Sequence, residues 1–158
     1  MKHPLATTLR LARAGDLHAM ALLSRDLIET GLAWRYTPRR MAELVADDDI
    51  SAVVACEGSR LCGFGIMQFG DTHAHLVLLG VQAAQQRRGV GGQLHGWLLA
   101  SARAAGMAAI GLELRADNPA ALAFYRRLGY AELPGTAGYY DGRIAARRMR
   151  LVLRETPA

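Results

Sequence analysis

The residues best suited to chemistry form the glycine-rich run QRRGVGG at positions 86–92. The run follows the apolar stretch LVLLGV and precedes a helical pattern, so its glycines would begin a helix. Without Cβ atoms, the backbone N–H groups there can approach a ligand closely, and the helix dipole adds positive potential. The pattern predicts an anion cradle suited to a pyrophosphate. It lacks the Lys-Ser/Thr pair of a P-loop and the complete GxGxxG of a dinucleotide-binding turn, and a basic loop with flexible glycines is the alternative.

Few other side chains suggest nucleophilic catalysis or metal binding. The two cysteines, Cys56 and Cys62, are too few and wrongly spaced for a zinc site or a disulfide framework, and no HExxH motif brings histidines together. We therefore predict no metal site and interpret both cysteines as buried strand residues without a catalytic role. His73 and His75 are candidate bases, although a lone histidine is more often structural or exposed.

Length and composition indicate one globular domain over residues 1–158. The chain is 51% hydrophobic and 21% charged, and a core of this size folds without a disulfide or structural metal. No stretch approaches about 18 consecutive apolar residues, the length of a membrane span. The N-terminal MKHPLATTLR lacks the apolar core and cleavage site of a signal peptide. We expect a cytoplasmic protein with no membrane partner.

The charge balance favours an anionic ligand. The net charge is +5, and eighteen of the nineteen basic residues are arginine, the better bidentate phosphate binder. Nucleic acid is not expected as a partner, because the arginines are spread along the chain and few aromatic residues lie among them to stack bases. A basic, solvated surface explains most of these charges equally well.

Hydrophobic periodicity predicts an order of elements that mixes strands and helices. Strands are predicted at residues 8–12, 51–56, 61–69, 73–81, 108–115 and 146–153. Helices are predicted at residues 17–28, 38–45, 89–105 and 118–128, with Gly31, Gly106 and Gly129 after three of them. Residues 51–69 form a hairpin, 139–142 (YYDG) a turn, and 73–81, apolar without alternation at its end, a central strand buried on both faces. The order implies a layered α/β domain with a partly parallel, partly antiparallel sheet.

Two linked motifs resemble the signatures of the GNAT superfamily of acyl-CoA-dependent N-acyltransferases. QRRGVG at 86–91 matches [Gln/Arg]-x-x-Gly-x-[Gly/Ala] after a strand and at the start of a helix. NPAALAFYRRLGY at 118–130 is similar to the second hallmark, Asn-x-x-Ala-x-x-(Phe/Leu)-Tyr-x-x-Leu-Gly-(Phe/Tyr). The motifs occur in the required order, and the resemblance extends from about residue 8 to residue 153. It implies a single domain whose mixed central sheet has about six or seven strands, with helices on both faces.

The resemblance implies acetyl-CoA as cosubstrate and assigns residues to it. The backbone of Leu79, Gly80 and Val81 would bond the pantetheine arm like an added strand, and Asn118 would hydrogen-bond the same arm. Tyr125 would lie near the thioester sulfur and protonate the leaving thiolate. By themselves, Asn118 is an N-cap and Tyr125 a core aromatic residue. The loop residues that would hold the pyrophosphate are Gln86, Arg87, Arg88, Gly89, Val90, Gly91 and Gly92.

Within the superfamily, LELRADNPAALAFYRRLGY and GYYDG look most like bacterial ribosomal-protein alanine N-acetyltransferases, which acetylate a protein's N-terminal amine. Glu113 matches their general base, and His73 or His75 could serve instead. The chain departs from the pattern at residues 143–146 (RIAA), where an acidic Glu-Asp is common, and at Leu78, where Asn is common. These departures concern the acceptor and leave the acetyl-CoA residues unchanged.

The acceptor is the open part of the prediction. An N-terminal amine, with a pKa of about 7.7–8.0, is roughly 10–20% neutral at pH 7 and demands less of a base than lysine. A small amine such as a polyamine, amino acid or aminoglycoside is the alternative acceptor. Either would enter a mouth around Trp34, Tyr36 and Tyr139. A non-catalytic CoA-binding module is the remaining hypothesis, and the presence of both a candidate base and a candidate acid speaks against it.

Overall fold

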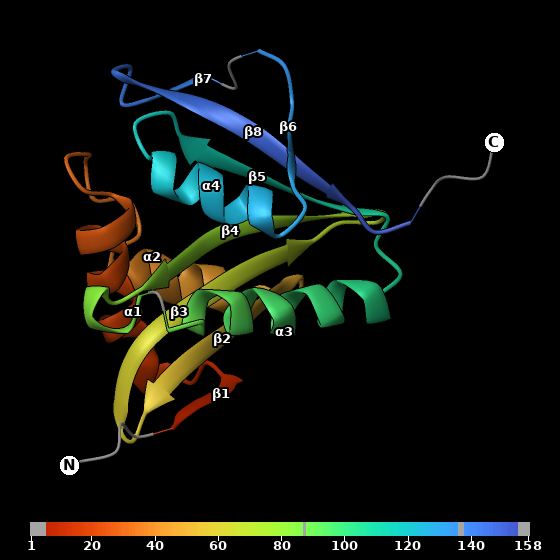
Figure 1. The fold of residues 1–158 in the computed structure, drawn as a ribbon. Helices are drawn as coiled ribbons and strands as arrows, with labels where there is room; N and C mark the ends of the chain where they lie inside the picture. The colour runs from red at the N-terminus through yellow and green to blue at the C-terminus, as the bar shows by residue number, and fades with distance from the viewer. Residues whose placement is uncertain (1–5, 87, 136–137, 155–158) are drawn as a thin grey trace.

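One mixed β-sheet organises the chain in a computed structural model that describes residues 6–86, 88–135 and 138–154 (Figure 1). Its strands there are β1 (Thr7–Leu11), β2 (Ile50–Glu57), β3 (Arg60–Phe69), β4 (His73–Val81), β5 (Ala109–Arg115), β6 (Ala131–Glu132), β7 (Gly138–Tyr140) and β8 (Ile144–Val152). Their order is β1-β2-β3-β4-β5-β8-β6, with β7 paired to β8. Only β4 and β5 pair in parallel within these residues. The mixed sheet is confirmed. The described residues form eight strands, more than predicted, because β6 and β7 are too short for a periodic pattern.

The helices begin and end where the local sequence favours it. They are α1 (Leu17–Leu23), which continues as a π-helical turn (Ser24–Ile28), α2 (Pro38–Val45), α3 (Val90–Ala104) and α4 (Pro119–Arg127). Thr37 Oγ1 accepts a hydrogen bond from Arg40 N at 3.4 Å, and Asn118 Oδ1 accepts one from Ala121 N at 3.0 Å. Proline follows each of these N-caps at the helix start. Beyond the end of α3, Gly106 adopts a φ of +77°, which disfavours any L side chain.

Helices cover both faces of the sheet, as predicted. α3 and α4 pack on one face over a buried cluster that includes Leu94, Leu98 and Leu112, whereas α1 and α2 pack on the other over Met41 and Phe64 (Figure 1). Burying each of these side chains contributes about 1.5–3 kcal/mol. The two clusters therefore hold the middle of the sheet rigidly from both sides.

The two cysteines belong to this core. Cys56 on β2 and Cys62 on β3 are both buried and unpaired. Their prediction as buried strand residues is confirmed.

β4 lies at the centre of the sheet, as predicted, but it is not buried on both faces. It pairs with β3 along its length, whereas its ladder with β5 joins only residues 73–76 to 109–112. Ile66 faces Leu78 and the next residue, Met67, faces Leu76, so Val77 is an extra residue that forms a bulge. The second half of β4 is thereby turned away from β5, and its residues alternate between buried and partly exposed.

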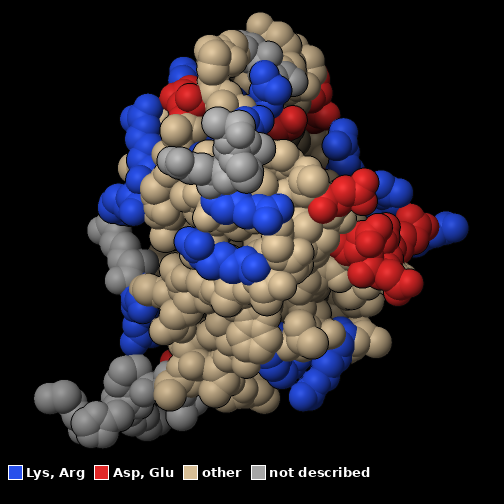
Figure 2. Space-filling view, turned by 90° about the vertical axis from the view of Figure 1, so that its right-hand side faces the viewer, with Lys and Arg blue, Asp and Glu red and all other residues tan. Residues whose placement is uncertain are grey.

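The charged surface is dispersed. On the face shown in Figure 2 the basic side chains stand in several groups separated by uncharged surface, and a group of acidic side chains lies at one edge. Several arginines are neutralised locally, as in the Arg10–Asp16 pair at 2.6 Å. No helix formed by the described residues is long and apolar enough to cross a membrane.

Candidate active site

A gap in the sheet forms the centre of the candidate site. Beyond the last β4–β5 pair, Leu76 with Leu112, both strands continue, and a cavity of about 840 Å³ is lined by their diverging ends. The amide of Gln82 donates to Cys62 O on β3 at 2.7 Å, so the alternate residue Val81 directs its backbone groups to the opposite edge. Accordingly, Val81 O accepts a hydrogen bond from Gln86 Nε2 at 2.9 Å rather than from β3. This edge of β4 can pair with an extended ligand as with an added strand.

The start of α3 lies at one end of the cavity. Gly89 is its N-cap, with φ +81°, and the Gln93 amide donates to Gly89 O at 3.0 Å. The N–H groups of the first turn of α3 have no helical acceptor and can bind an anion. A Cβ atom on Gly89 or Gly92 would meet no other atom within 4 Å, so the backbone is open to a ligand. A Cβ on Gly91 would instead lie 3.3 Å from the Phe124 ring.

Tyr125 and Asn118 bring α4 to the same cavity. Tyr125 is 9% exposed, and its ring packs edge-on against Phe124 at 5.1 Å and against Tyr130 at 5.4 Å between centroids. Burial raises the pKa of the Tyr125 phenol well above its usual value, so it stays protonated at neutral pH. Tyr130 in turn hydrogen-bonds the buried His95 ring, 2.8 Å from its hydroxyl to Nε2. The ring of Tyr125 is therefore fixed, with a proton available.

Glu113 reaches the cavity from the other face of β5. Leu112 and Leu114, its neighbours, belong to the core under α3 and α4, so Glu113 points to the opposite face, where it is exposed. It forms no ion pair with a described residue. Tyr140, also lining the cavity, has its pKa raised by burial and further by the Glu113 charge. Tyr140 was not predicted from the sequence, although it neighbours the predicted Tyr139.

The two candidate histidines differ in position. His75 is exposed and lines the cavity, on the strand beside Glu113. His73 is not among the lining residues, and its Nδ1 lies 2.8 Å from Thr72 Oγ1 in a hydrogen bond. Only His75 is placed to act on a group inside the cavity.

A buried carboxylate, that of Glu29, shapes the loop at residues 29–36, and this loop forms a second wall of the cavity. Glu29 is 7% exposed and accepts hydrogen bonds from Ser24 Oγ at 2.8 Å, Arg35 N at 2.6 Å and Tyr36 N at 3.2 Å. These bonds satisfy the buried charge and fold the loop back on itself. Sequence reasoning missed Glu29 because its partners are mainly backbone amides, which no residue pattern reports.

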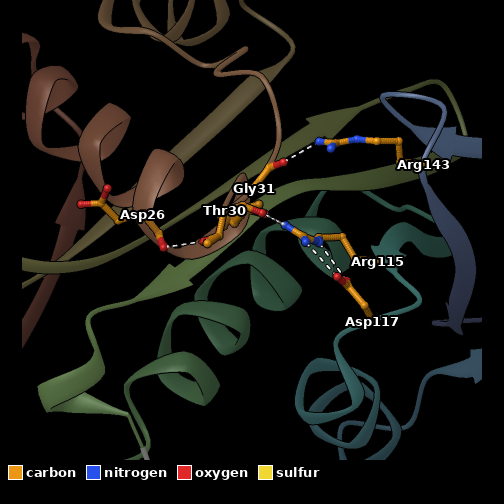
Figure 3. A network of polar contacts seen from close by, with 7 residues as sticks. Asp26, Thr30, Gly31, Arg115, Asp117 and Arg143 are labelled. Carbon is orange, nitrogen blue, oxygen red and sulfur yellow. Dashed lines mark hydrogen bonds and ion pairs between the residues drawn. The ribbon is translucent and has the colours of Figure 1, made fainter.

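Two arginines tie this loop to the far side of the sheet (Figure 3). Arg115 on β5 is oriented by two hydrogen bonds of 2.9 Å to Asp117, and it donates to Thr30 O at 2.5 Å. Arg143, in the turn just before β8, donates to Gly31 O at 2.7 Å. The loop and the β7–β8 turn thus form one continuous rim, and the turn also accepts the amide of Ala33 through Asp141 at 2.8 Å.

The structure brings most of the predicted site residues to one cavity and leaves three of the described ones elsewhere. Trp34 packs beside the α1–α2 cluster, with the Arg25 guanidinium 5.4 Å from its ring centroid, and does not line the cavity. The Val90 side chain is 2% exposed and belongs to the core, so only its backbone can contribute to the site. Arg88 is exposed and does not line the cavity. Arg87 lies outside the described residues. The predicted residues that line the cavity are Tyr36, Leu79, Gly80, Val81, Gln86, Gly89, Gly91, Gly92, Glu113, Asn118, Tyr125 and Tyr139.

Comparison with known proteins gives relatives of one kind. The chain is 35% identical over 90 residues to the [Ribosomal protein bS18]-alanine N-acetyltransferase of Escherichia coli K12, a match that covers 55% of this chain and 61% of that protein. It is 38% identical over 92 residues to the N-alpha-acetyltransferase RimI of Mycobacterium tuberculosis, over 56% of each chain. The matched stretch thus spans about three fifths of these curated relatives.

Solved structures match over nearly the whole length. The structure of Ard1 from Thermoplasma volcanium superposes with a TM-score of 0.83 at 25% identity, covering 96% of this chain and 100% of that one. The E. coli ribosomal-protein-S18-alanine N-acetyltransferase superposes with a TM-score of 0.78 at 23% identity, covering 96% and 97%. Residues 19–130, more than half of the chain, match the acetyltransferase (GNAT) family. The order of the two motifs agrees with these matches, and the chain belongs to the GNAT family of acetyltransferases.

Proposed function

We propose that the protein transfers the acetyl group of acetyl-CoA to the α-amine of a protein N-terminus. The observation that carries the proposal is the gap between β4 and β5, where a bulge at Val77 exposes an unpaired strand edge at the centre of the sheet. A candidate acid, Tyr125, and a candidate base, Glu113, reach this gap from opposite faces.

The residues around the gap fit a CoA thioester. The open edge at Leu79 and Val81 would pair with the amides of the pantetheine arm, and Asn118 would add a hydrogen bond while it caps α4. The first turn of α3, with Gly89 and Gly91, would hold the pyrophosphate on free N–H groups. When bound, acetyl-CoA supplies an activated acetyl carbonyl and a thiolate leaving group.

The residues on the acceptor side would prepare the amine. A terminal amine with a pKa of about 7.7–8.0 is partly neutral at pH 7, so a modest base suffices. Glu113 is exposed to the cavity and forms no ion pair with a described residue, so its carboxylate can accept the proton directly or through water. His75 is the other lining residue able to do so.

The residues on the thiolate side would complete the transfer. The backbone N–H of Leu79, directed into the gap, would stabilise negative charge on the acetyl oxygen, while the N–H of Val81 serves the pantetheine arm. Tyr125 keeps its proton because burial raises its pKa, and it would donate that proton to the departing sulfur. The acetyl group would pass directly to the amine, without an acyl-enzyme, since both cysteines are buried away from the cavity lining.

A peptide N-terminus fits the acceptor side better than the alternatives. Tyr36, Tyr139 and Tyr140 line the mouth and offer aromatic surface and hydroxyls to a peptide backbone. The curated relatives are named as an N-alpha-acetyltransferase and as ribosomal-protein alanine N-acetyltransferases, which is consistent with this acceptor.

Acceptor panels test the proposal. The purified protein would be incubated with acetyl-CoA and, separately, with free-N-terminus peptides, N-blocked peptides that contain lysine, polyamines and aminoglycosides. Thiol release would be measured, and mass spectrometry would locate the acetyl group. We expect α-amine acetylation of unblocked peptides. Turnover only with small amines would overturn the acceptor, and no thiol release with any acceptor would overturn the enzymatic role.

A further inference from the structure

One area of the sheet remains uncovered beside Glu113. Ile110, Leu112 and Leu114 of β5 are buried under α3 and α4, so the alternate residues Gly111 and Glu113 face the other way. The helices α1 and α2 cover that second face over β2, β3 and the end of β4, but not over β8. Its exposure there is marked by Val152, which is 60% exposed.

Strand register places two arginines on this uncovered face. Arg148 lies opposite Glu113 and Arg150 lies opposite Gly111, and residues opposite one another share a face. Both arginines are exposed. Gly111 separates Arg150 from His75, which is its partner on the other side, and a Cβ on Gly111 would meet only Met149 O at 4.0 Å. The arginines therefore border an open, shallow strip that begins at Glu113.

The charges of these arginines are not balanced locally. Their neighbour Arg147 points to the opposite face and pairs with Glu132, which also pairs with Arg126. By contrast, neither Arg148 nor Arg150 forms an ion pair with a described residue. Arg148 and Glu113, although opposite each other, are likewise not joined. An exposed guanidinium pair beside the candidate base is free to bind a carboxylate.

We propose that Arg148 and Arg150 bind an acidic side chain located within the few residues that follow the acceptor's terminal amine. The inference rests on the proposed function, because it is Glu113 that fixes where the amine lies. It adds a substrate class, namely N-termini that carry aspartate or glutamate near the reacting residue.

The dimensions of an extended chain suit this arrangement. Opposite residues on antiparallel strands have Cβ atoms about 4.5–5.5 Å apart, and a strand rises about 3.3 Å per residue. Arg150 lies two residues beyond Arg148 on β8, hence about 7 Å farther along the strip. An acceptor whose amine contacts Glu113 therefore brings the side chains of its second to fourth residues within reach of one arginine or both.

The test uses matched peptides and charge-reversed variants. Peptides with Asp at position 2, 3 or 4 would be compared with their Asn counterparts by kcat/KM at low and high salt. Two exposed ion pairs predict a preference of about two- to thirty-fold for the acidic peptide, carried by KM and reduced by salt. Arg148→Glu combined with Arg150→Glu should reverse it in favour of Lys-containing peptides. Arg103→Glu, on the exposed surface of α3, carries the same change of charge as Arg148→Glu or Arg150→Glu alone, and it should keep the acidic preference that each of these single variants lowers.

The outcomes separate this inference from the proposed function. One outcome is that peptides are acetylated without any preference for Asp over Asn, and another is that the double variant keeps the wild-type preference. In either case Arg148 and Arg150 do not bind an acidic side chain of the acceptor, and the proposed function stands. A preference lowered equally by Arg103→Glu and by the single variants Arg148→Glu and Arg150→Glu would also overturn the inference, since net charge alone would be the cause. If no peptide is acetylated at all, the proposed function fails first.

Discussion

Replacement of Gly89 by alanine tests the role of the loop that precedes α3. Gly89 has φ +81°, and a Cβ atom there would meet nothing within 4 Å. Gly89→Ala thus creates no clash, and its effect comes only from the left-handed backbone, which disfavours an L side chain by about 1–2 kcal/mol. Gly106 provides a matched control at the other end of α3. It has φ +77° and equally open space, and it does not line the cavity.

The expected magnitudes follow from this strain. Gly106→Ala should lower the free energy of unfolding by about 1–2 kcal/mol, which corresponds to a decrease in Tm of about 2–8 °C for a domain of this size, and Gly89→Ala should lower it by less. In Gly89→Ala the free loop can relax out of the left-handed geometry, and binding must then restore it. Up to the same energy is lost from binding, so Kd for acetyl-CoA should rise by up to about five- to thirty-fold. Gly106→Ala should leave Kd unchanged.

Calorimetric titration with acetyl-CoA and thermal unfolding of both variants measure these quantities. A normal Kd in Gly89→Ala, together with a fall in Tm clearly smaller than that of Gly106→Ala, would refute the assignment of the loop to the pyrophosphate, because a relaxed loop would then bind without being restored.

Three further predictions concern single side chains. Tyr125→Phe should lower kcat by about 10²–10⁴-fold and leave acetyl-CoA binding intact, because the ring packing is kept; unchanged turnover in stopped-flow assays would exclude it as the acid. Glu113→Gln should lower kcat most near pH 7 and progressively less towards pH 8, as the amine loses its own proton, and a loss independent of pH would contradict its role as base. Burial lowers the pKa of His95 below 6.5, so the unfolded chain binds the proton more readily and stability falls as the pH drops below about 6.5. His95→Gln, which still offers a hydrogen bond to Tyr130, should flatten that fall in Tm between pH 7 and pH 5.

The elements that could be predicted from the sequence are those with a periodic pattern or a local cap. Thr37 and Asn118 cap α2 and α4 through their own side chains, so these helix starts are encoded within a few residues. The bulge at Val77 has no such local signal. It arises from the register of pairing between β3 and β4. Because of this bulge, the end of the apolar run at residues 73–81, predicted to be buried on both faces, lines one side of the cavity.

The same distinction applies to the candidate site. The glycine loop at residues 86–92 and the α4 motif at residues 118–130 are each a continuous stretch of sequence, so both could be predicted from residue patterns. The acceptor rim is assembled from segments about a hundred residues apart, as in the Arg143–Gly31 bond, and no spacing rule reports such contacts. Strand alternation also distinguishes the two adjacent tyrosines, Tyr139 and Tyr140. Tyr140 lies on the same face of the sheet as Glu113, whose charge helps to raise the pKa of Tyr140. Trp34, expected at the mouth of the cavity, packs instead against the buried cluster under α1 and α2.

The open edge of β4 also has a consequence for amide hydrogen exchange. Central strands are usually the slowest part of a domain to exchange, because their amides are all paired. Along residues 78–81, however, only alternate N–H groups point towards β3, and those of Leu79 and Val81 point into the gap. Exchange in the free protein should therefore alternate between fast and slow from one residue to the next in the middle of the sheet. A ligand that pairs with this edge should slow only the fast set, which makes these two amides a residue-resolved reporter of occupancy.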